Sequence, residues 1–167
     1  GNSLADKEEA RHVHHGADDN ASGVAAVLAI AEALASVPRP RHVLLGFWSG
    51  EEIGLLGSAA FVRASTVPVD QLAAYLNFDM VGRMQDNKLI VQATGTSPVW
   101  TRLLERANVA AGFDLVVQPD PYQPTDVASF NQASVASLSF STGAHTDYHK
   151  PSDTADRINY PDLDRIV

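Results

Sequence analysis

Two adjacent glutamates, Glu51 and Glu52, stand where an apolar run meets a turn. They follow residues 43–48 and a Ser-Gly pair, and further glycines keep the next segment tight. Neighbouring side chains on a turning chain point in different directions, so two carboxylates there are able to serve one centre from two sides. The alternative is a helix N-terminus in which acidic residues complement the helix dipole. The other acidic and imidazole residues of the chain decide between these interpretations.

Two further segments, GADDNASG at residues 16–23 and NFDMVGR around Asp79, supply more carboxylates. One Asp or Asn suffices as the N-cap of the helix that follows the first segment, which leaves at least one carboxylate without that role. Asp79 is expected inside an apolar strand, where a carboxylate is unfavourable unless it is paired or coordinates a cation. A salt bridge to Arg83 is therefore the alternative to a metal-binding role for Asp79.

Two later segments complete the set of candidate groups. YHKPSD carries Tyr148 and His149, and PTDVASF carries Asp126, for which an N-cap is the alternative role. His42 is interpreted as a structural residue at the start of a strand. His12, His14 and His15 are interpreted as loop residues.

The candidate groups form a ligand set of Asp, Glu and His. The sequence has no cysteine, so a disulfide and a thiolate metal site are excluded. Carboxylate and imidazole ligands with an open position for water are typical of catalytic Zn²⁺. A metal-bound water needs a base to take its proton, and a carboxylate next to a ligating carboxylate suits that role. We therefore expect one of the adjacent glutamates to bind metal and the other to act on the water.

Composition argues against several other classes of function. The formal net charge of −8 disfavours nucleic acid and anionic membranes as partners. No apolar run approaches the roughly 20 residues of a membrane-spanning helix. Residues 1–15 have the composition of a polar surface loop and lack the apolar core of a signal peptide. The 167 residues have the length of one domain.

Predicted helices and strands alternate along the chain, and they must position these groups. Helical spacing predicts helices near 20–36, 57–64, 97–112, within 121–133 and from 160 onward. Apolar runs predict strands near 42–48, 73–80, 87–94, 113–118 and 135–141. This alternation predicts an α/β fold, a three-layer α/β/α sandwich around a mostly parallel sheet. Ligands of such sheets bind beyond the carboxyl ends of the strands, where the polar segments of this sequence fall.

Four segments in order, GADDNASG, SGEEIGLLGS, NFDMVGR and TDYHKPSDT, resemble the motifs of the co-catalytic zinc aminopeptidases. This family includes bacterial leucyl aminopeptidases, and glutaminyl cyclases share its fold. The resemblance runs from about Gly16 to the end of the sequence. It implies an enzyme that hydrolyses peptides at a free N-terminus and holds two zincs when intact. It also implies an extracellular or periplasmic location, because bacterial members are often exported.

The resemblance implies roles for individual residues as well. The bridging ligand of the family directly precedes an Asn, which selects Asp19 rather than Asp18. The implied roles are the bridging ligand Asp19, the further ligands Glu52 and His149 of one site and Asp79 of the other, the general base Glu51 and the oxyanion donor Tyr148. Asp126 is a separate candidate for substrate binding, and in a glutaminyl cyclase Asp79 and Asp126 would be acidic partners.

One ligand of the family pattern is not in this sequence. The second zinc of the family also takes a His from an HxD motif upstream of the bridging Asp, and the chain starts after that point. We therefore expect residues 1–167 to be an N-terminally truncated catalytic domain that binds one zinc or none and is weakly active or inactive. His14 or His15 as a substitute ligand is one alternative. A single-zinc glutaminyl cyclase and an inactive interaction module of the same fold are two others.

Overall fold

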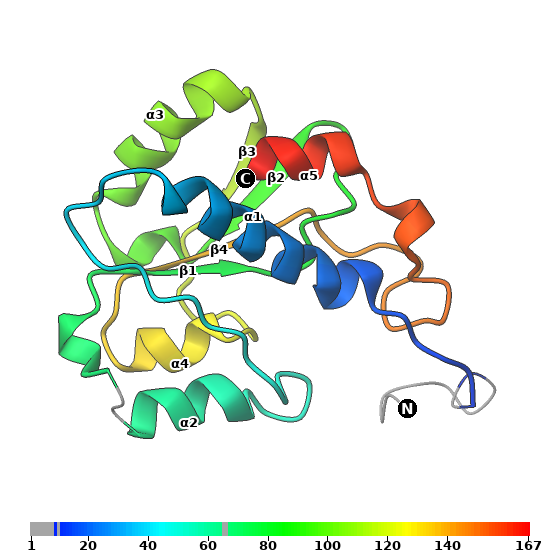
Figure 1. Ribbon diagram of the computed structural model, residues 1–167, viewed down its shortest axis with the longest axis horizontal. Helices are drawn as coiled ribbons and strands as arrows, with labels where there is room; N and C mark the ends of the chain where they lie inside the picture. Colours follow the sequence, from blue (N-terminus) through cyan, green and yellow to red (C-terminus); the bar gives the residue numbers. More distant parts are fainter. Residues whose placement is uncertain (1–8, 10, 65–66) are drawn as a thin grey trace. The chain divides into compact units, whose positions relative to one another are not determined.

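Helices and strands alternate in the computed structural model, which describes residue 9 and residues 11–64 and 67–167. The helices are α1 (Gly23–Ala35), α2 (Leu56–Ala64), α3 (Trp100–Ala111), α4 (Val127–Gln132) and α5 (Tyr160–Ile166) (Figure 1). The strands are β1 (Tyr75–Phe78), β2 (Lys88–Gln92), β3 (Asp114–Gln118) and β4 (Ser137–Ser141). They form a mixed four-stranded sheet in the order β1-β4-β2-β3, so the predicted α/β class is confirmed. No helix of the described residues is long and apolar enough to cross a membrane.

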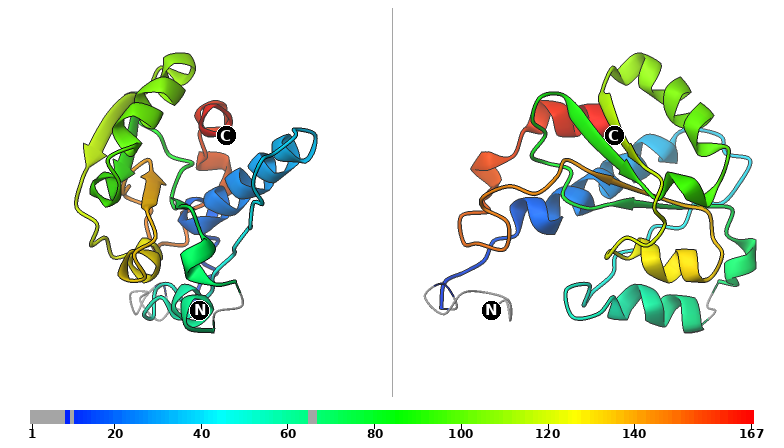
Figure 2. Two further views of the ribbon diagram at one scale, coloured as in Figure 1. Left: turned by 90° about the vertical axis from the view of Figure 1, so that its left-hand side faces the viewer. Right: turned by 180° about the vertical axis from the view of Figure 1, so that it is seen from behind.

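The chain divides into two compact units. Unit 1 comprises the described residues of Gly1–Leu45, Phe78–Leu89 and Ser141–Val167, and unit 2 those of Gly46–Asn77 and Ile90–Phe140. Within unit 1, α1 and α5 contact each other. Within unit 2, α2 and α4 lie side by side, and Figure 2 shows the pair from two directions.

An aromatic cluster packs around the buried side chain of Phe130 in unit 2. The ring of Tyr75 stacks on Phe130 with centroids 3.8 Å apart, and Trp48 meets Phe61 at 5.0 Å. Trp48 Nε1 donates a hydrogen bond of 3.1 Å to the hydroxyl of Tyr75, which donates in turn to Asn77 Oδ1 at 2.9 Å. The segment that leads to the two glutamates is thus fixed to β1 by both packing and hydrogen bonds.

Several element boundaries follow from recognisable residues. Helix α3 ends at Gly112, whose φ of 68° and N–H bond of 2.8 Å to Asn108 O form the left-handed helix end that glycine favours. The same helix begins at Trp100, three residues later than the sequence predicts. Helix α5 is capped by Asn159, whose side chain accepts a hydrogen bond from Asp162 N at 3.3 Å.

The predicted strand at 42–48 is wrong. No strand is assigned there in the described part of the chain, and the side chains expected to be buried on both faces are instead exposed. Val43, Leu44, Leu45 and Phe47 keep 51%, 54%, 41% and 51% of their surface accessible. An apolar run becomes a strand only where a neighbouring strand satisfies its backbone groups, and no described strand pairs with this one. The loop expected over 1–15 lies partly outside the described residues.

Candidate metal centre

Asp19 and His149 meet in unit 1. Asp19 lies in the turn η1 (Ala17–Ser22) that precedes α1, and His149 lies in the loop that follows β4. Asp19 Oδ2 is 3.0 Å from His149 Nε2, and the two side chains are 18% and 19% exposed. A carboxylate oxygen and an imidazole nitrogen at this distance, both still partly accessible, are the donor types that zinc prefers in proteins. This pair therefore fits a zinc ion chemically.

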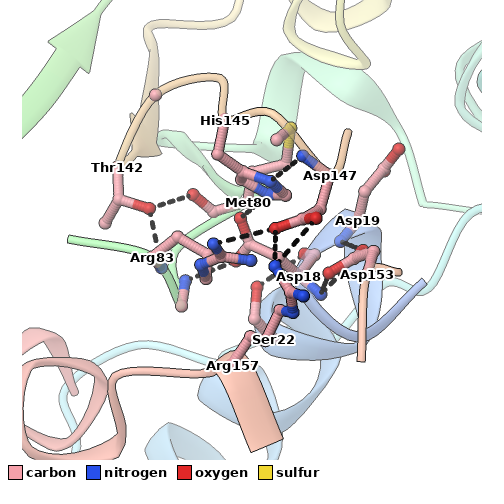
Figure 3. A network of polar contacts seen from close by, with 12 residues as sticks. Asp18, Asp19, Ser22, Met80, Arg83, Thr142, His145, Asp147, Asp153 and Arg157 are labelled. Carbon is pink, nitrogen blue, oxygen red and sulfur yellow. Dashed lines mark hydrogen bonds and ion pairs between the residues drawn. The ribbon is translucent and has the colours of Figure 1, made fainter. Parts of the chain in front are cut away.

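Asp18, the neighbour of Asp19, points in another direction. Its side chain is fully buried, and Oδ1 accepts a hydrogen bond of 2.7 Å from Gly82 N. Oδ2 lies 3.1 Å from His145 Nε2. Burial raises the pKa of Asp18, while the bonds from Gly82 and Ser22 oppose that rise. The two adjacent aspartates thus separate into a buried residue and an accessible one, and Figure 3 shows their side chains pointing in different directions.

The carboxylate of Asp153 holds the turn η1 through its backbone. It accepts hydrogen bonds of 3.0 and 3.1 Å from Asp18 N and one of 3.1 Å from Asp19 N. Neither aspartate of the turn caps a helix, and the first N–H of α1, that of Gly23, bonds instead to Asn20 Oδ1 at 3.0 Å. A single Asn of the segment thus supplies an oxygen to the start of α1, and both aspartates are left without that role.

Asn20 also holds the residues on both sides of Asp79. Its Nδ2 donates to Phe78 O at 3.0 Å, and its Oδ1 accepts from Met80 N at 3.2 Å. Asp79 directly follows the last residue of β1 rather than lying inside the strand. Arg83, the alternative partner for Asp79, forms its ion pair with Asp147 at 3.1 Å.

His145 and Asp147 shape the loop that carries His149. The His145 side chain is 2% exposed, and its Nδ1 accepts a bond of 3.2 Å from Asp147 N. Nε2 therefore carries the proton that is donated to Asp18. The Asp147 carboxylate accepts bonds from Ser152 (2.8 Å), Arg83 (3.1 Å) and Arg157 (2.9 and 3.0 Å). The bond from Ser152 and these guanidinium groups lower the pKa of Asp147 to about 2.

Tyr148 stacks on the imidazole of His149, with ring centroids 3.7 Å apart. The Tyr148 side chain remains exposed at 40%. Stacking restricts the rotation of the imidazole, while the exposure of Tyr148 leaves its ring accessible from solvent.

The two glutamates lie in a tight turn of unit 2, as predicted. Glu51 O accepts hydrogen bonds from Gly54 N at 3.0 Å and Leu55 N at 2.9 Å. A side chain at Gly57 would lie 2.8 Å from the backbone of Ser49, so the turn requires glycine there. Helix α2 begins only at Leu56 and has no acidic residue in its first turn. The helix-dipole alternative for the glutamates is therefore wrong.

Asp126 stands at the N-cap position of α4 without capping it. Its side chain is 8% exposed, and its Oδ1 is buried with no hydrogen-bond partner among the described residues. Burial raises its pKa, and a hydrogen bond from Ser58 opposes the rise. The N-cap alternative is wrong here, and Asp126 is a buried carboxylate with unused hydrogen-bonding capacity.

The sequence motifs indicate no role for four residues of the network around Asp19: Asp18, His145, Asp147 and Asp153 (Figure 3). The density of His, Asp, Ser and Thr in residues 142–154 was the only signal for the last three. His14 Nε2 bonds the backbone oxygen of Glu9 at 3.2 Å. Neither His14 nor His15 belongs to a group of potential metal ligands within the described residues.

The chain is similar to several known aminopeptidases. Leucine aminopeptidase 2 of Arthroderma otae is 28% identical over 173 residues, which cover 86% of this chain and 35% of the relative. A probable lipoprotein aminopeptidase of Mycobacterium tuberculosis is 44% identical over 68 residues, 40% of this chain and 14% of the relative. The chain thus spans about a third of the first relative's length.

Solved structures give the same fold. BSAP, a zinc aminopeptidase from Bacillus subtilis, superposes with a TM-score of 0.80 and 27% identity over 92% of this chain and 40% of that structure. A glutaminyl cyclase of Bacteroides thetaiotaomicron, with a TM-score of 0.72 and 22% identity over 97% of this chain and 63% of that one, shares the fold alone. Residues 4–167 match the sequence profile of peptidase family M28. The chain belongs to peptidase family M28.

Proposed function

We propose that residues 1–167 are part of one catalytic domain of a zinc aminopeptidase, which removes residues from the free N-terminus of peptides. The pairing of Asp19 with His149 at 3.0 Å carries the proposal, because it joins two donor types of a zinc site in an accessible place. Membership of peptidase family M28 supports peptides as substrates. The likeness to a zinc aminopeptidase at 27% identity supports zinc as the metal.

Zinc would be held by Asp19, His149 and Glu52, three protein ligands that leave a fourth position open. Asp79 would serve a second zinc together with Asp19. Because that pair offers carboxylates alone, which suit zinc less well than a set with imidazole, we expect at most about one zinc to bind this chain tightly. When bound, zinc supplies Lewis-acid chemistry, which polarises a carbonyl and lowers the pKa of a water.

The remaining candidate residues handle protons and the substrate. Glu51 takes a proton from the attacking water on its carboxylate and returns it to the leaving amine. The hydroxyl of Tyr148 donates a hydrogen bond to the oxygen that becomes negative in the transition state. Asp126, with an unsatisfied carboxylate oxygen, accepts a hydrogen bond from the substrate's α-ammonium group.

We also propose that the protein acts outside the cytoplasm, in the extracellular space or the periplasm. The similarity to a probable lipoprotein aminopeptidase over 68 residues supports this location. Fractionation of the native host, with detection of the protein in the periplasm or the medium, tests it directly. Recovery in the cytoplasm alone would contradict it.

The test of the proposed function is a comparison of His149→Ala with His42→Ala, a matched change in an exposed loop. After dialysis against zinc, we expect about one zinc per chain in the wild type and in His42→Ala, and loss of zinc in His149→Ala. Aminoacyl-nitroanilide hydrolysis is measured beside cyclisation of a peptide with N-terminal Gln. Retention of zinc by His149→Ala would overturn the proposed site. Cyclisation without hydrolysis would make the chain a glutaminyl cyclase instead.

A further inference from the structure

The carboxylate of Asp18 touches all three segments of unit 1 that carry proposed metal ligands. It belongs to the turn of Asp19, it accepts a bond of 2.7 Å from Gly82 N in the segment after Asp79, and it pairs at 3.1 Å with His145 in the loop of His149. Its side chain is 0% exposed and that of His145 is 2% exposed. A pair that is closed to solvent in this way is not available to substrate or water. The contacts of Asp18 therefore make this residue a structural link between the three segments (Figure 3).

Further hydrogen bonds connect the same three segments. Ser22 Oγ donates to Asp18 O at 2.7 Å and accepts from Val81 N at 3.1 Å, so a second link connects the turn to the segment after Asp79. Asp153, downstream of His149, binds the backbone of the turn. The ligand segments are thus connected to one another by protein groups alone.

We propose that Asp18 and His145 are positioning residues that hold the Asp19, Asp79 and His149 segments in place for metal binding. This inference rests on the proposed function, since it concerns the same metal centre. Ligands that are held in place before the metal arrives lose less conformational freedom on binding. Residues behind metal ligands typically contribute 10–100-fold to metal affinity, which sets the expected size of the effect.

The hydrogen bonds of Asp18 and His145 make this pair sensitive to a substitution that replaces a single acceptor by a donor. His145 Nδ1 already accepts a bond from Asp147 N, so its Nε2 must donate, and Gly82 N is also a donor. Both oxygens of Asp18 therefore receive donors. In Asp18→Asn one oxygen becomes an NH₂ group, and in either amide orientation a donor faces a donor. The substitution keeps the shape of the side chain but breaks one of the two links.

The experiment compares Asp18→Asn and His145→Asn with Asp164→Asn, a matched change at an exposed position of α5. Zinc affinity of the full chain is measured by competition with a chromophoric chelator, and the visible spectrum of bound Co²⁺ reports ligand geometry. In metal-free protein, hydrogen exchange is followed at the amides of Gly82 and Asp147. We expect about 10–100-fold weaker zinc binding, an altered Co²⁺ spectrum and faster exchange at both amides in the two network variants. Asp164→Asn should change none of these.

The double variant Asp18→Asn/His145→Asn tests whether the two residues act as a unit. If they do, its loss of zinc-binding free energy is smaller than the sum of the two single losses, because both single variants disturb the same Asp18–His145 contact. Should Asp18→Asn fail to fold, His145→Asn alone carries the comparison. Unchanged zinc affinity in both single variants, or faster exchange confined to residues 16–20, would overturn the inference. Absence of zinc binding by the wild type overturns the proposed function instead, and the metal-free exchange measurement still decides whether Asp18 links the segments.

Discussion

Adjacent residues of the same type occupy different environments in this chain because the backbone turns between them. Asp18 is fully buried, whereas the Asp19 side chain keeps 18% of its surface accessible and meets His149. Glu51 and Glu52 likewise occupy one turn, in which Glu52 is the more exposed of the two. A pair of carboxylates on a turn is therefore able to divide binding from proton transfer without any change of residue type.

Glu51→Gln tests this division at the two glutamates. We expect turnover to fall by roughly 10²–10⁴-fold while zinc stays bound, because the proposed base is lost and the proposed ligands remain. Glu52→Gln, the matched change one residue away, should lower zinc affinity instead. Zinc content and the rate of hydrolysis are measured on the same purified samples, in a form of the protein that hydrolyses substrate. The opposite pattern would show that the two roles are exchanged.

Asp126→Asn separates stability from function at a buried carboxylate. The folded state raises the pKa of Asp126 above its ordinary value of 3.8, so the folded protein holds this proton more tightly than the unfolded chain. The stability linked to this proton is present below pH 3.8 and declines as the pH rises through the folded pKa. The Asn variant should therefore be more stable than the wild type at pH 7 and no more stable at pH 3.

Urea denaturation at the two pH values measures the effect of Asp126→Asn. The Asn variant should also hydrolyse substrate more weakly at pH 7 if Asp126 binds the substrate's ammonium group. A loss of stability at pH 7 would show that the ionised carboxylate has a favourable partner in the fold.

The sequence predicts those helices and strands whose signals are local. Helix α1 and the glycine end of α3 follow from spacing and one residue type, and β2 and β3 follow from short apolar runs between turns. The run 42–48 carries the same apolar signal as β1, yet only β1 is paired in the described sheet. A strand depends on a partner elsewhere in the chain, and composition of the run itself carries no information about that partner.

The predicted site residues belong to local sequence motifs, whereas the missed ones make contacts between distant parts of the chain. Asp19 and His149 were expected from motifs, whereas Asp153 binds the backbone of Asp18 across 135 residues of sequence. His145 meets Asp18 across 127 residues. Contacts of this range are set by the packed fold, so Asp153 and His145 emerge only once the loops are seen together.

Gly112→Ala tests the local signal at the end of α3. The residue has a φ of 68° and nothing within 4 Å of the added methyl group, so the cost is that of the left-handed backbone alone. We expect a loss of about 1 kcal/mol in the free energy of unfolding, measured by denaturant titration. Gly112→Asn should lose less, since Asn tolerates this conformation better than Ala. Equal losses in the two variants would point to a cause other than backbone conformation.

At the scale of the whole molecule, the net charge of −8 indicates an acidic surface. Several large apolar side chains are nevertheless exposed on it. Val24 and Leu28 of α1 and Val43 and Leu44 of the unpaired run each keep between 43% and 54% of their surface accessible. Scattered exposed apolar residues are ordinary, but consecutive ones promote association. The run 43–45 therefore marks the part of unit 1 most prone to self-association.

The double substitution Val43→Lys/Leu44→Lys tests that assignment. Both side chains are already about half exposed, at 51% and 54%, so the free energy of unfolding should change by less than about 0.5 kcal/mol per site. Self-association, measured by sedimentation velocity over a range of concentrations, should decrease. Val91→Ala in β2, where the side chain is fully buried, is the contrast and should lose about 2 kcal/mol. If the lysine variant lost a similar amount of free energy of unfolding, the run 43–45 would be buried in solution. The lysine charges would then lie against apolar neighbours, which is unfavourable.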